Sequence, residues 1–299
     1  MNIQQLLDKN FFIPAYQRGY RWAPQQVKDF LNDINQFEPK INDKGEKSWY
    51  CLQPLVLKPM DNESVTMNGL DTEKIWYEVI DGQQRLTTIF LVVHYINEMW
   101  KGKSKHKEFT LKYQTRQSSS NFLNFLEVDA TNNDVIINDQ NIDFFFISTA
   151  YKAIHKWAEN LKNCEELNED EFGSKIIHYT KVIWYETESD SVEVFTRLNV
   201  GKIPLTNAEL IKALFLNKTN FIELNDKDKA KIRLQQIEIS TEWDRMEYAL
   251  QNDSFWYFLT DKKVLTTRID LIFNLISNKQ TNDDDFFTFR FFSEKLKQE

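Results

Sequence analysis

The sequence predicts an α+β protein, with a mixed domain over residues 1–105 followed by a mostly α-helical domain over residues 106–299. Three observations support this prediction. Strand-like and helical segments alternate in the first hundred residues, whereas helical periodicity dominates later. Between these parts, residues 101–120 are basic and polar, which indicates a domain boundary. Finally, only 7 Gly and 6 Pro occur among 299 residues, so the composition favours helix.

Proline and glycine determine the expected elements near the N-terminus. Pro14 and Gly19 exclude a regular helix from the segment FFIPAYQRGYRWAP, and Pro24 suits the first position of a helix. In the segment WYCLQPLVLK, Pro54 indicates an edge strand or a bulge. The elements expected up to residue 100 are an amphipathic turn at 3–7, a helix from residue 24 to 37, strands at 49–58 and 75–80 with a polar loop or hairpin between them, and an apolar helix at 84–100.

Helical periods dominate the second part of the chain. Thr206 and Glu209 match a capping box in front of an apolar run, which predicts a helix start there. The acidic run Asp283–Asp285 is expected to cap another helix. The expected helices are 144–161, 170–179, 191–198, 206–216, 226–251 and 267–277, with one strand-like segment, KVIWYET, at 181–187.

Charge and cysteine usage limit the classes of function. The net charge is -8 and the isoelectric point is about 5.3, so the chain lacks the basic character of a general nucleic-acid binder. Contact with a nucleic acid would need a local patch or pocket. Cys51 and Cys164 lie far apart, which excludes a zinc knuckle and suits a reducing cytosol. The N-terminus has no signal-peptide pattern and no apolar run spans a bilayer, so we expect a cytoplasmic protein without a membrane partner.

Several common catalytic motifs are absent from the sequence. There is no GxxxxGK[ST] phosphate loop, no GxSxG, no HExxH and no GxGxxG. The four histidines share no local segment with one another or with a cysteine, and none follows His178. A nuclease built on a His-Asn-His metal finger is therefore not expected in the C-terminal half.

The first candidate site is the sequence EVIDGQQRLTT, from Glu78 to Thr88, at a predicted strand-to-helix turn. Gly82 would let the backbone turn and approach a ligand closely. The first helical turn offers N–H groups to an anion, and Arg85 adds a bidentate phosphate donor. Asp81 would hold Mg²⁺, orient Arg85 or polarise a water molecule. The alternative is structural: Asp81 is only the helix N-cap and Arg85 only a surface charge.

The second candidate site is the segment IPAYQRGYRW, from Ile13 to Trp22. Its aromatic rings and guanidinium groups alternate in a way that suits stacking on a base with phosphate contacts alongside. In the alternative reading the aromatic residues anchor this segment on the core and the arginines face water.

The third candidate site is the segment VFTRLNVGKIPL, from Val194 to Leu205, which leads into the capped helix. Arg197, Asn199 and Lys202 would face a ligand. The alternative is an ordinary helix–turn–helix connection, which explains Gly201, Pro204 and Thr206 without any ligand. The basic segment from Lys101 to Arg116 would help to hold DNA, but a solvated loop is the simpler interpretation.

Taken in this order, the three motifs resemble the N-terminal domain of GmrSD-type modification-dependent restriction proteins, which also occurs in a phosphorothioate-sensing defence protein. The resemblance implies a ParB/sulfiredoxin-like N-terminal domain, with a nucleotide-hydrolysis motif at DGQQR and recognition of modified DNA by the YQRGYRW segment. The catalytic candidates are Asp81, Gln84 and Arg85. The nucleotide-binding candidates are Gly82, Gln83, Thr87, Thr88, Asn199 and Lys202. The candidates for DNA or base contact are Tyr16, Gln17, Arg18, Tyr20, Arg21 and Trp22. Asp81 is the candidate metal ligand, for Mg²⁺.

The sequence departs from the family in two places. Gln53 and Pro54 stand where many members have a glycine, and the C-terminal His-Asn-His nuclease domain of many members is absent. We therefore expect a truncated protein, a standalone sensor or one subunit of a split system.

The leading hypothesis is an NTP-binding and NTP-hydrolysing DNA-sensing domain of a restriction or phage-defence system. Its expected partners are a nucleoside triphosphate, modified DNA, a His-Asn-His nuclease domain or subunit outside this chain, and a second copy of the chain. Two alternatives stay open: a non-enzymatic sensor of modified DNA that recruits or regulates a nuclease, and a Mg²⁺-dependent DNA nuclease or nickase.

Overall fold

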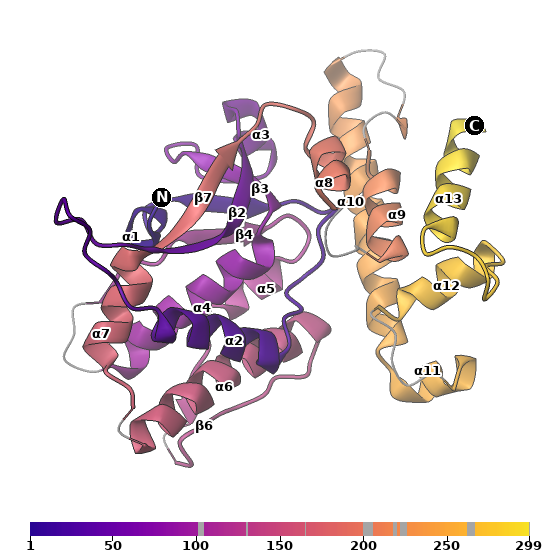
Figure 1. The fold of residues 1–299 in the computed structure, drawn as a ribbon. Coiled ribbons are helices and arrows are strands. Elements are labelled where there is room, and N and C mark those ends of the chain that lie inside the picture. The colour runs from indigo at the N-terminus through magenta and orange to yellow at the C-terminus, as the bar shows by residue number, and fades with distance from the viewer. Residues whose placement is uncertain are drawn as a thin grey trace. The chain divides into compact units, whose positions relative to one another are not determined.

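The computed structural model of the chain (Figure 1) describes residues 1–100, 105–129, 131–164, 166–199, 206–217, 220–221, 226–261 and 267–298. The chain divides into two units with separate cores. Unit 1 contains Met1–Ile13 and Gly19–Glu188, and unit 2 contains Pro14–Arg18 and Ser189–Glu299.

Unit 1 is built on a five-stranded mixed sheet. Its strands are β1 (Asn10–Ile13), β2 (Tyr50–Pro59), β3 (Trp76–Asp81), β4 (Thr110–Tyr113) and β7 (Thr180–Glu186), in the order β4-β1-β3-β2-β7. Strand β1 is parallel to β3 and β4, whereas β2 is antiparallel to β3 and parallel to β7. A separate ribbon pairs β5 (Val128–Asp129) with β6 (Asp134–Val135).

Helices cover both faces of this sheet (Figure 1). They are α1 (Ile3–Leu6), α2 (Pro24–Gln36), α3 (Asn62–Met67), α4 (Gln83–Met99), α5 (Gln117–Phe122), α6 (Ile142–Asn163), α7 (Glu169–Ser174) and a π-helical turn, η1 (Lys175–Tyr179). Successive residues of a strand point to opposite faces: Phe11 packs in the large core with α2, α4 and α6, whereas Phe12 packs with Val65 of α3.

The α+β class is confirmed, and most elements of unit 1 follow their predicted ranges. Pro24 is the first residue of α2, as predicted. The pairing of β2 with β7 shifts between Leu52 and Leu55, so Pro54 lies in a bulge. The edge alternative is wrong, because β2 has a neighbour on each side. The polar loop expected before the second strand contains α3, whose start is capped by Asp61.

The boundary predicted at residue 105 does not separate the two units. Strand β4 pairs with β1, and strand β7 pairs with β2, although both follow that position. Helix α6 also contributes Ile147, Tyr151 and Ile154 to the same core as β1. Residues 106–188 therefore belong to unit 1, and the division falls after Glu188.

Unit 2 is helical apart from its connections. Its helices are α8 (Ser191–Asn199), α9 (Asn207–Phe215), α10 (Asp226–Leu250), α11 (Asp253–Leu259), α12 (Ile269–Ile276) and α13 (Phe287–Gln298). The core includes Ile211, Trp243, Trp256 and Phe273. The capping box of Thr206 and Glu209 is confirmed. Helix α11 was not predicted from the sequence, whereas α13 begins directly after the acidic run Asp283–Asp285, where a helix start is expected.

The described parts of the chain contain no helix that is both long and apolar enough to span a membrane.

Candidate functional site

A single residue makes the turn between β3 and α4. Strand β3 ends at Asp81 and helix α4 begins at Gln83. Gly82, between them, has a φ of +99°, in the left-handed region that favours glycine. A Cβ atom at this position would lie 2.4 Å from Cδ2 of Leu55. The predicted turning role of Gly82 is therefore confirmed, while its approach to a ligand stays a prediction.

Asp81 does not cap the helix, so that structural alternative is wrong. The N-cap of α4 is Gly82, and no side chain among the described residues caps the helix. The carboxylate of Asp81 instead pairs with the guanidinium of Arg85 at 3.3 Å, with 29% of its side chain exposed. The first turn of α4 thus begins without a side-chain acceptor for its N–H groups.

Arg85 is more than a surface charge, because its guanidinium lies against the bulge of β2. Its Nη1 donates to Oε1 of Gln53 at 2.8 Å, and its Nη2 donates to the carbonyl of Pro54. Only 14% of the side chain is exposed. Burial lowers the pKa of Arg85, and the neighbouring charge of Asp81 opposes this effect. The Nε atom is buried and has no hydrogen-bond partner among the described residues.

The two glutamines join the first and second motifs. Oε1 of Gln84 accepts a hydrogen bond from the backbone N–H of Arg21 at 2.7 Å, and Nε2 of Gln84 donates to the carbonyl of Gly19 at 3.1 Å. The same Nε2 donates to Oε1 of Gln83 at 2.6 Å, and Gln83 donates in turn to the hydroxyl of Tyr113 at 2.9 Å. Through these two side chains, the DGQQR turn, Gly19 and Arg21 form one hydrogen-bonded assembly in unit 1.

Thr87, Thr88 and Tyr20 lie beneath this assembly in the interior. The Oγ1 of Thr87 donates to the carbonyl of Gln83, and that of Thr88 donates to the carbonyl of Gln84, each at 3.0 Å. The hydroxyls of Tyr20 and Thr88 are 2.9 Å apart. Burial raises the pKa of Tyr20. All three side chains support the turn from below, and Trp22 packs against the core through Phe30, with 6.0 Å between ring centroids.

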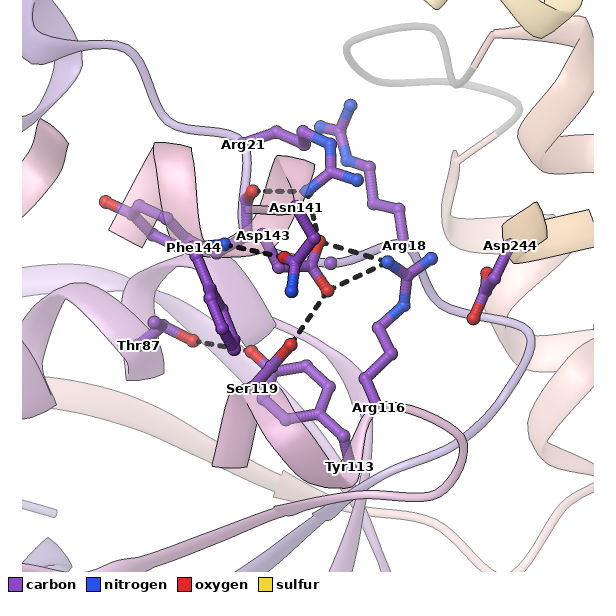
Figure 2. Close-up of polar contacts among 12 residues, drawn as sticks. Arg18, Arg21, Thr87, Tyr113, Arg116, Ser119, Asn141, Asp143, Phe144 and Asp244 are labelled. Atoms are coloured by element: carbon purple, nitrogen blue, oxygen red, sulfur yellow. Dashed lines mark hydrogen bonds and ion pairs between the residues drawn. The ribbon is translucent and has the colours of Figure 1, made fainter. Parts of the chain in front are cut away.

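The guanidinium of Arg21 is held by a buried carboxylate that the sequence did not indicate. Nη1 of Arg21 donates to Oδ1 of Asp143 at 2.6 Å. Nη1 of Arg116 donates to both oxygens of Asp143, at 3.0 and 2.9 Å, and the hydroxyl of Ser119 donates at 3.0 Å. Figure 2 shows these three groups directed at the carboxylate. Burial would raise the pKa of Asp143, but the charges of Arg116 and Arg21 outweigh it and lower the pKa.

Gly19 makes this arrangement of charges sterically feasible. A Cβ atom at residue 19 would lie 2.0 Å from Oδ1 of Asp143 and 2.9 Å from Nη1 of Arg21. Only a residue without a side chain leaves room for the carboxylate at this point. Asp143 lies in the first turn of α6, far from Arg21 and Arg116 in sequence, so no local motif could have revealed it.

Residues Pro14–Arg18 of the second motif belong to unit 2. Nη1 of Arg18 pairs with Oε1 of Glu209 at 2.9 Å, with 34% of the Arg18 side chain exposed. Tyr16 is buried against Phe195, with 5.1 Å between ring centroids. Gln17 is also buried. The structural alternative is thus borne out for the aromatic residues Tyr16, Tyr20 and Trp22, which pack in the interior. Its expectation that the arginines face water is wrong for Arg21, which is buried against Asp143, while Arg18 is partly exposed and ion-paired.

Residues 3–216 match a family model that is described as the N-terminal domain of the GmrSD restriction endonuclease. The chain belongs to this family. The protein is therefore a component of a DNA restriction or defence system. All three motifs of this GmrSD-type domain fall within the matched residues. The comparison with curated proteins found no match.

The third motif of the GmrSD-type domain is described only in part. The side chain of Asn199, together with Gly201 and Lys202, lies outside the described residues. In the adjoining helix α9, the buried amine of Lys212 pairs with Asp244 at 3.1 Å. Residues 101–104 of the basic segment lie outside the described residues. Lys105 pairs with Glu98 and Lys107 with Asp8 at the surface, as expected for a solvated loop. That interpretation is wrong for the end of the segment, where residues 110–113 form β4 and Arg116 is buried against Asp143.

A metal site in this GmrSD-type domain would depend on Asp81 and on the ligand. Among the described residues, no group of three His, Cys, Asp or Glu side chains is placed to bind a metal ion. Mg²⁺ is commonly held by one or two carboxylates together with substrate phosphates. The partly exposed carboxylate of Asp81 at the start of α4 fits such a shared site, and it does not fit a site made by protein alone.

Proposed function

We propose that this GmrSD-type domain binds a nucleoside triphosphate at the DGQQR turn and hydrolyses it in response to modified DNA. The observation that carries the proposal is the uncapped start of α4, flanked by the guanidinium of Arg85 and the carboxylate of Asp81. A helix N-terminus favours an anion through its N–H groups and its dipole. Phosphoryl transfer needs mainly positioning and charge stabilisation, which this arrangement offers.

Arg85 would bind the phosphates. Its buried Nε has no partner among the described residues, so a phosphate that reached it would displace no existing hydrogen bond. Its Nη atoms would exchange the neutral oxygens of Gln53 and Pro54 for phosphate oxygens, which make stronger charge-assisted hydrogen bonds. Burial strengthens this preference, because a charge in a low-dielectric environment gains more from an anionic partner.

Asp81 would act beside Arg85 as the ligand of a Mg²⁺ ion carried in by the nucleotide. When bound, that ion would neutralise phosphate charge. The carboxylate of Asp81 would also orient the attacking water. Gln83, Gln84, Thr87 and Thr88 would keep the turn rigid rather than bind the nucleotide, since their side-chain groups are already engaged within unit 1.

Recognition of modified DNA would involve Arg18 and Arg21 on the second motif. Arg18 is partly exposed, and Arg21 is oriented by Asp143. Guanidinium groups suit the phosphate backbone of DNA. A His-Asn-His nuclease domain or subunit outside this chain would then act on the DNA.

Phosphate release from GTP, ATP and CTP, measured with and without modified duplex DNA, tests the proposal. We expect Mg²⁺-dependent turnover that the modified duplex stimulates. Asp81→Asn and Arg85→Ala should each reduce the rate by about a hundredfold or more. Arg245→Ala, which removes an exposed arginine of α10, is the matched control and should leave the rate unchanged. Unchanged turnover in correctly folded Asp81→Asn and Arg85→Ala proteins would contradict the assignment.

A second candidate function is a non-enzymatic sensor of modified DNA. It is favoured by one observation: the side chains of Gln83, Gln84 and Arg85 already make hydrogen bonds within unit 1. The motif would then be a structural support for the DNA-contacting segment. Tight, salt-dependent binding of modified duplex without turnover of any nucleotide would favour this candidate. The described residues offer no acidic cluster for the third hypothesis, a nuclease with its own metal site.

A further inference from the structure

The second motif is divided between the two units. Pro14–Arg18 packs with unit 2, whereas Gly19 and the residues after it pack with unit 1. We call the segment Pro14–Trp22 the strap. It has no helix or strand of its own, so side-chain contacts in each unit decide its position.

At the unit 1 end, Gln84 clamps the strap. Its two polar atoms bond the carbonyl of Gly19 at 3.1 Å and the N–H of Arg21 at 2.7 Å. The next residue along α4 is Arg85, the proposed phosphate ligand. Gln84 is therefore a side chain through which a change at the start of α4 reaches the strap directly, and Thr88 adds a second bond from the same helix, to Tyr20.

At the unit 2 end, Glu209 binds the strap through Arg18. Its Oε1 pairs with Arg18 at 2.9 Å. Its Oε2 accepts the backbone N–H of Thr206 at 2.9 Å, which closes the capping box of α9. One carboxylate thus holds both the strap and the first turn of a core helix. The hydroxyl of Ser240 in α10 adds a hydrogen bond to the carbonyl of Ala15 at 3.2 Å.

We propose that the strap couples the DGQQR turn to the helices of unit 2, with Gln84 and Glu209 as the positioning residues at its two ends. Arg18 and Gly19 share a peptide bond, so the contact to Glu209 and the contact to Gln84 are made by adjacent residues. A shift of Gln84 therefore changes the position of Arg18, and with it the start of α9. The ligand that causes the shift rests on the proposed function; the coupling itself does not.

Hydrogen–deuterium exchange of the full chain without ligand tests the coupling directly. In Gln84→Leu, which loses both bonds to the strap, we expect exchange to rise by about tenfold for peptides covering residues 14–18 and the start of α9. Gln84→Glu keeps the acceptor for Arg21 and should give a smaller rise. Asn97→Leu is the control, because it removes hydrogen bonds from the far end of the same helix. Faster exchange confined to unit 1 in Gln84→Leu would overturn the proposal.

A pair of variants at α9 separates coupling from helix capping. Glu209→Gln keeps a capping residue but removes the charge that holds Arg18, whereas Thr206→Ala weakens the cap and keeps the carboxylate. We expect Glu209→Gln to abolish the stimulation of phosphate release by modified duplex at an unchanged basal rate. Thr206→Ala should retain the stimulation. Equal stimulation in the wild-type protein and Glu209→Gln would overturn the role of Glu209. Absence of turnover in the wild-type protein would contradict the proposed function and leave the exchange experiment to decide the coupling.

Discussion

Gly82 meets two constraints that exclude any other residue. Its φ of +99° disfavours a side chain, and the space beside it is filled by Leu55. We predict that Gly82→Ala lowers the free energy of unfolding by about 2–4 kcal/mol, from backbone strain together with overpacking. Urea denaturation followed by circular dichroism measures the change.

Gly69 provides the control for this prediction. Its φ is +62°, but nothing lies within 4 Å of the position that a Cβ atom would occupy. Gly69→Ala should therefore lower the free energy of unfolding only through backbone strain, by about 1 kcal/mol. Equal losses in the two variants would mean that the contact with Leu55 contributes nothing.

The buried ion pairs of Asp143 predict a large loss of stability when this carboxylate is replaced. Replacement by Asn leaves Arg21 and Arg116 around a neutral amide in a largely buried site, and breaking such a pair costs about 3–5 kcal/mol. Ser119→Ala, which removes one hydrogen bond to the same carboxylate, should cost only about 1 kcal/mol. Because the native pKa of Asp143 lies below 3.8, its contribution is present above that pH and is lost as the pH falls further. The difference in unfolding free energy between the wild-type protein and Asp143→Asn should therefore be constant from about pH 5 to 8.

The sequence predicted roles at the residue scale only where the cause is local. Gly82 was identified because a turn between a strand and a helix needs a residue with positive φ. Gln84 is a catalytic candidate in the sequence, but its bonds to Gly19 and Arg21 were not predictable because they connect residues more than sixty positions apart. Asp143 has no sequence signal, because its partners lie on other segments of the chain.

At the scale of elements, the bulge in β2 explains the position of Arg85. The shift between Leu52 and Leu55 exposes the carbonyl of Pro54 and the amide of Gln53 to the guanidinium. Pro54 predicted this bulge, since proline cannot donate to a sheet ladder. The contact between this bulge and Arg85 was not predictable, because Arg85 lies on α4, which follows β3 rather than β2.

The ion pair of His94 and Glu108 ties α4 to the segment before β4, and it predicts a pH-dependent stability. Nδ1 of His94 and Oε1 of Glu108 are 3.1 Å apart. Burial opposes the charge of His94, but the hydrogen bond and charge of Glu108 outweigh it and raise the pKa of His94 above 6.5. Burial also opposes the charge of Glu108, but the hydrogen bonds from His94 and Asn97 outweigh it and lower the pKa of Glu108 below 4.5.

The direction of the pH dependence of stability follows from these two pKa shifts. His94 contributes stability below pH 6.5 and loses it as the pH rises through its native pKa, whereas Glu108 contributes above pH 4.5 and loses it as the pH falls. We therefore expect His94→Gln to cost more stability at about pH 5.5 than at about pH 8.5, by on the order of 0.5–1 kcal/mol. Urea denaturation at both pH values measures this difference. It should disappear when the same comparison is made in a Glu108→Gln background, and a persistent difference there would assign it to another group.

At the scale of the whole molecule, the division into units depends on contacts that composition does not report. Residues 101–120 change character sharply, yet β4 lies within that range and pairs with β1. Strand β7 follows β2 by more than a hundred residues and still lies beside it. A crossover of that length gives no local sequence signal. The family match also extends past residue 105 to residue 216, into unit 2, and all three motifs lie within it.

The net charge of -8 gives a prediction about the proposed binding of DNA by the whole molecule. An acidic protein is repelled by the phosphate backbone, so the proposed binding would depend on a few local contacts such as Arg18 and Arg21. Each neutralised phosphate contributes about −0.9 to the slope of log K against log salt concentration. We expect a slope of about −2 to −3 for modified duplex, measured by fluorescence anisotropy over a salt series. Arg18→Ala should weaken the slope by about 1, whereas Arg245→Ala should leave it unchanged. A much steeper slope that Arg18→Ala does not alter would show that DNA is bound by a different surface.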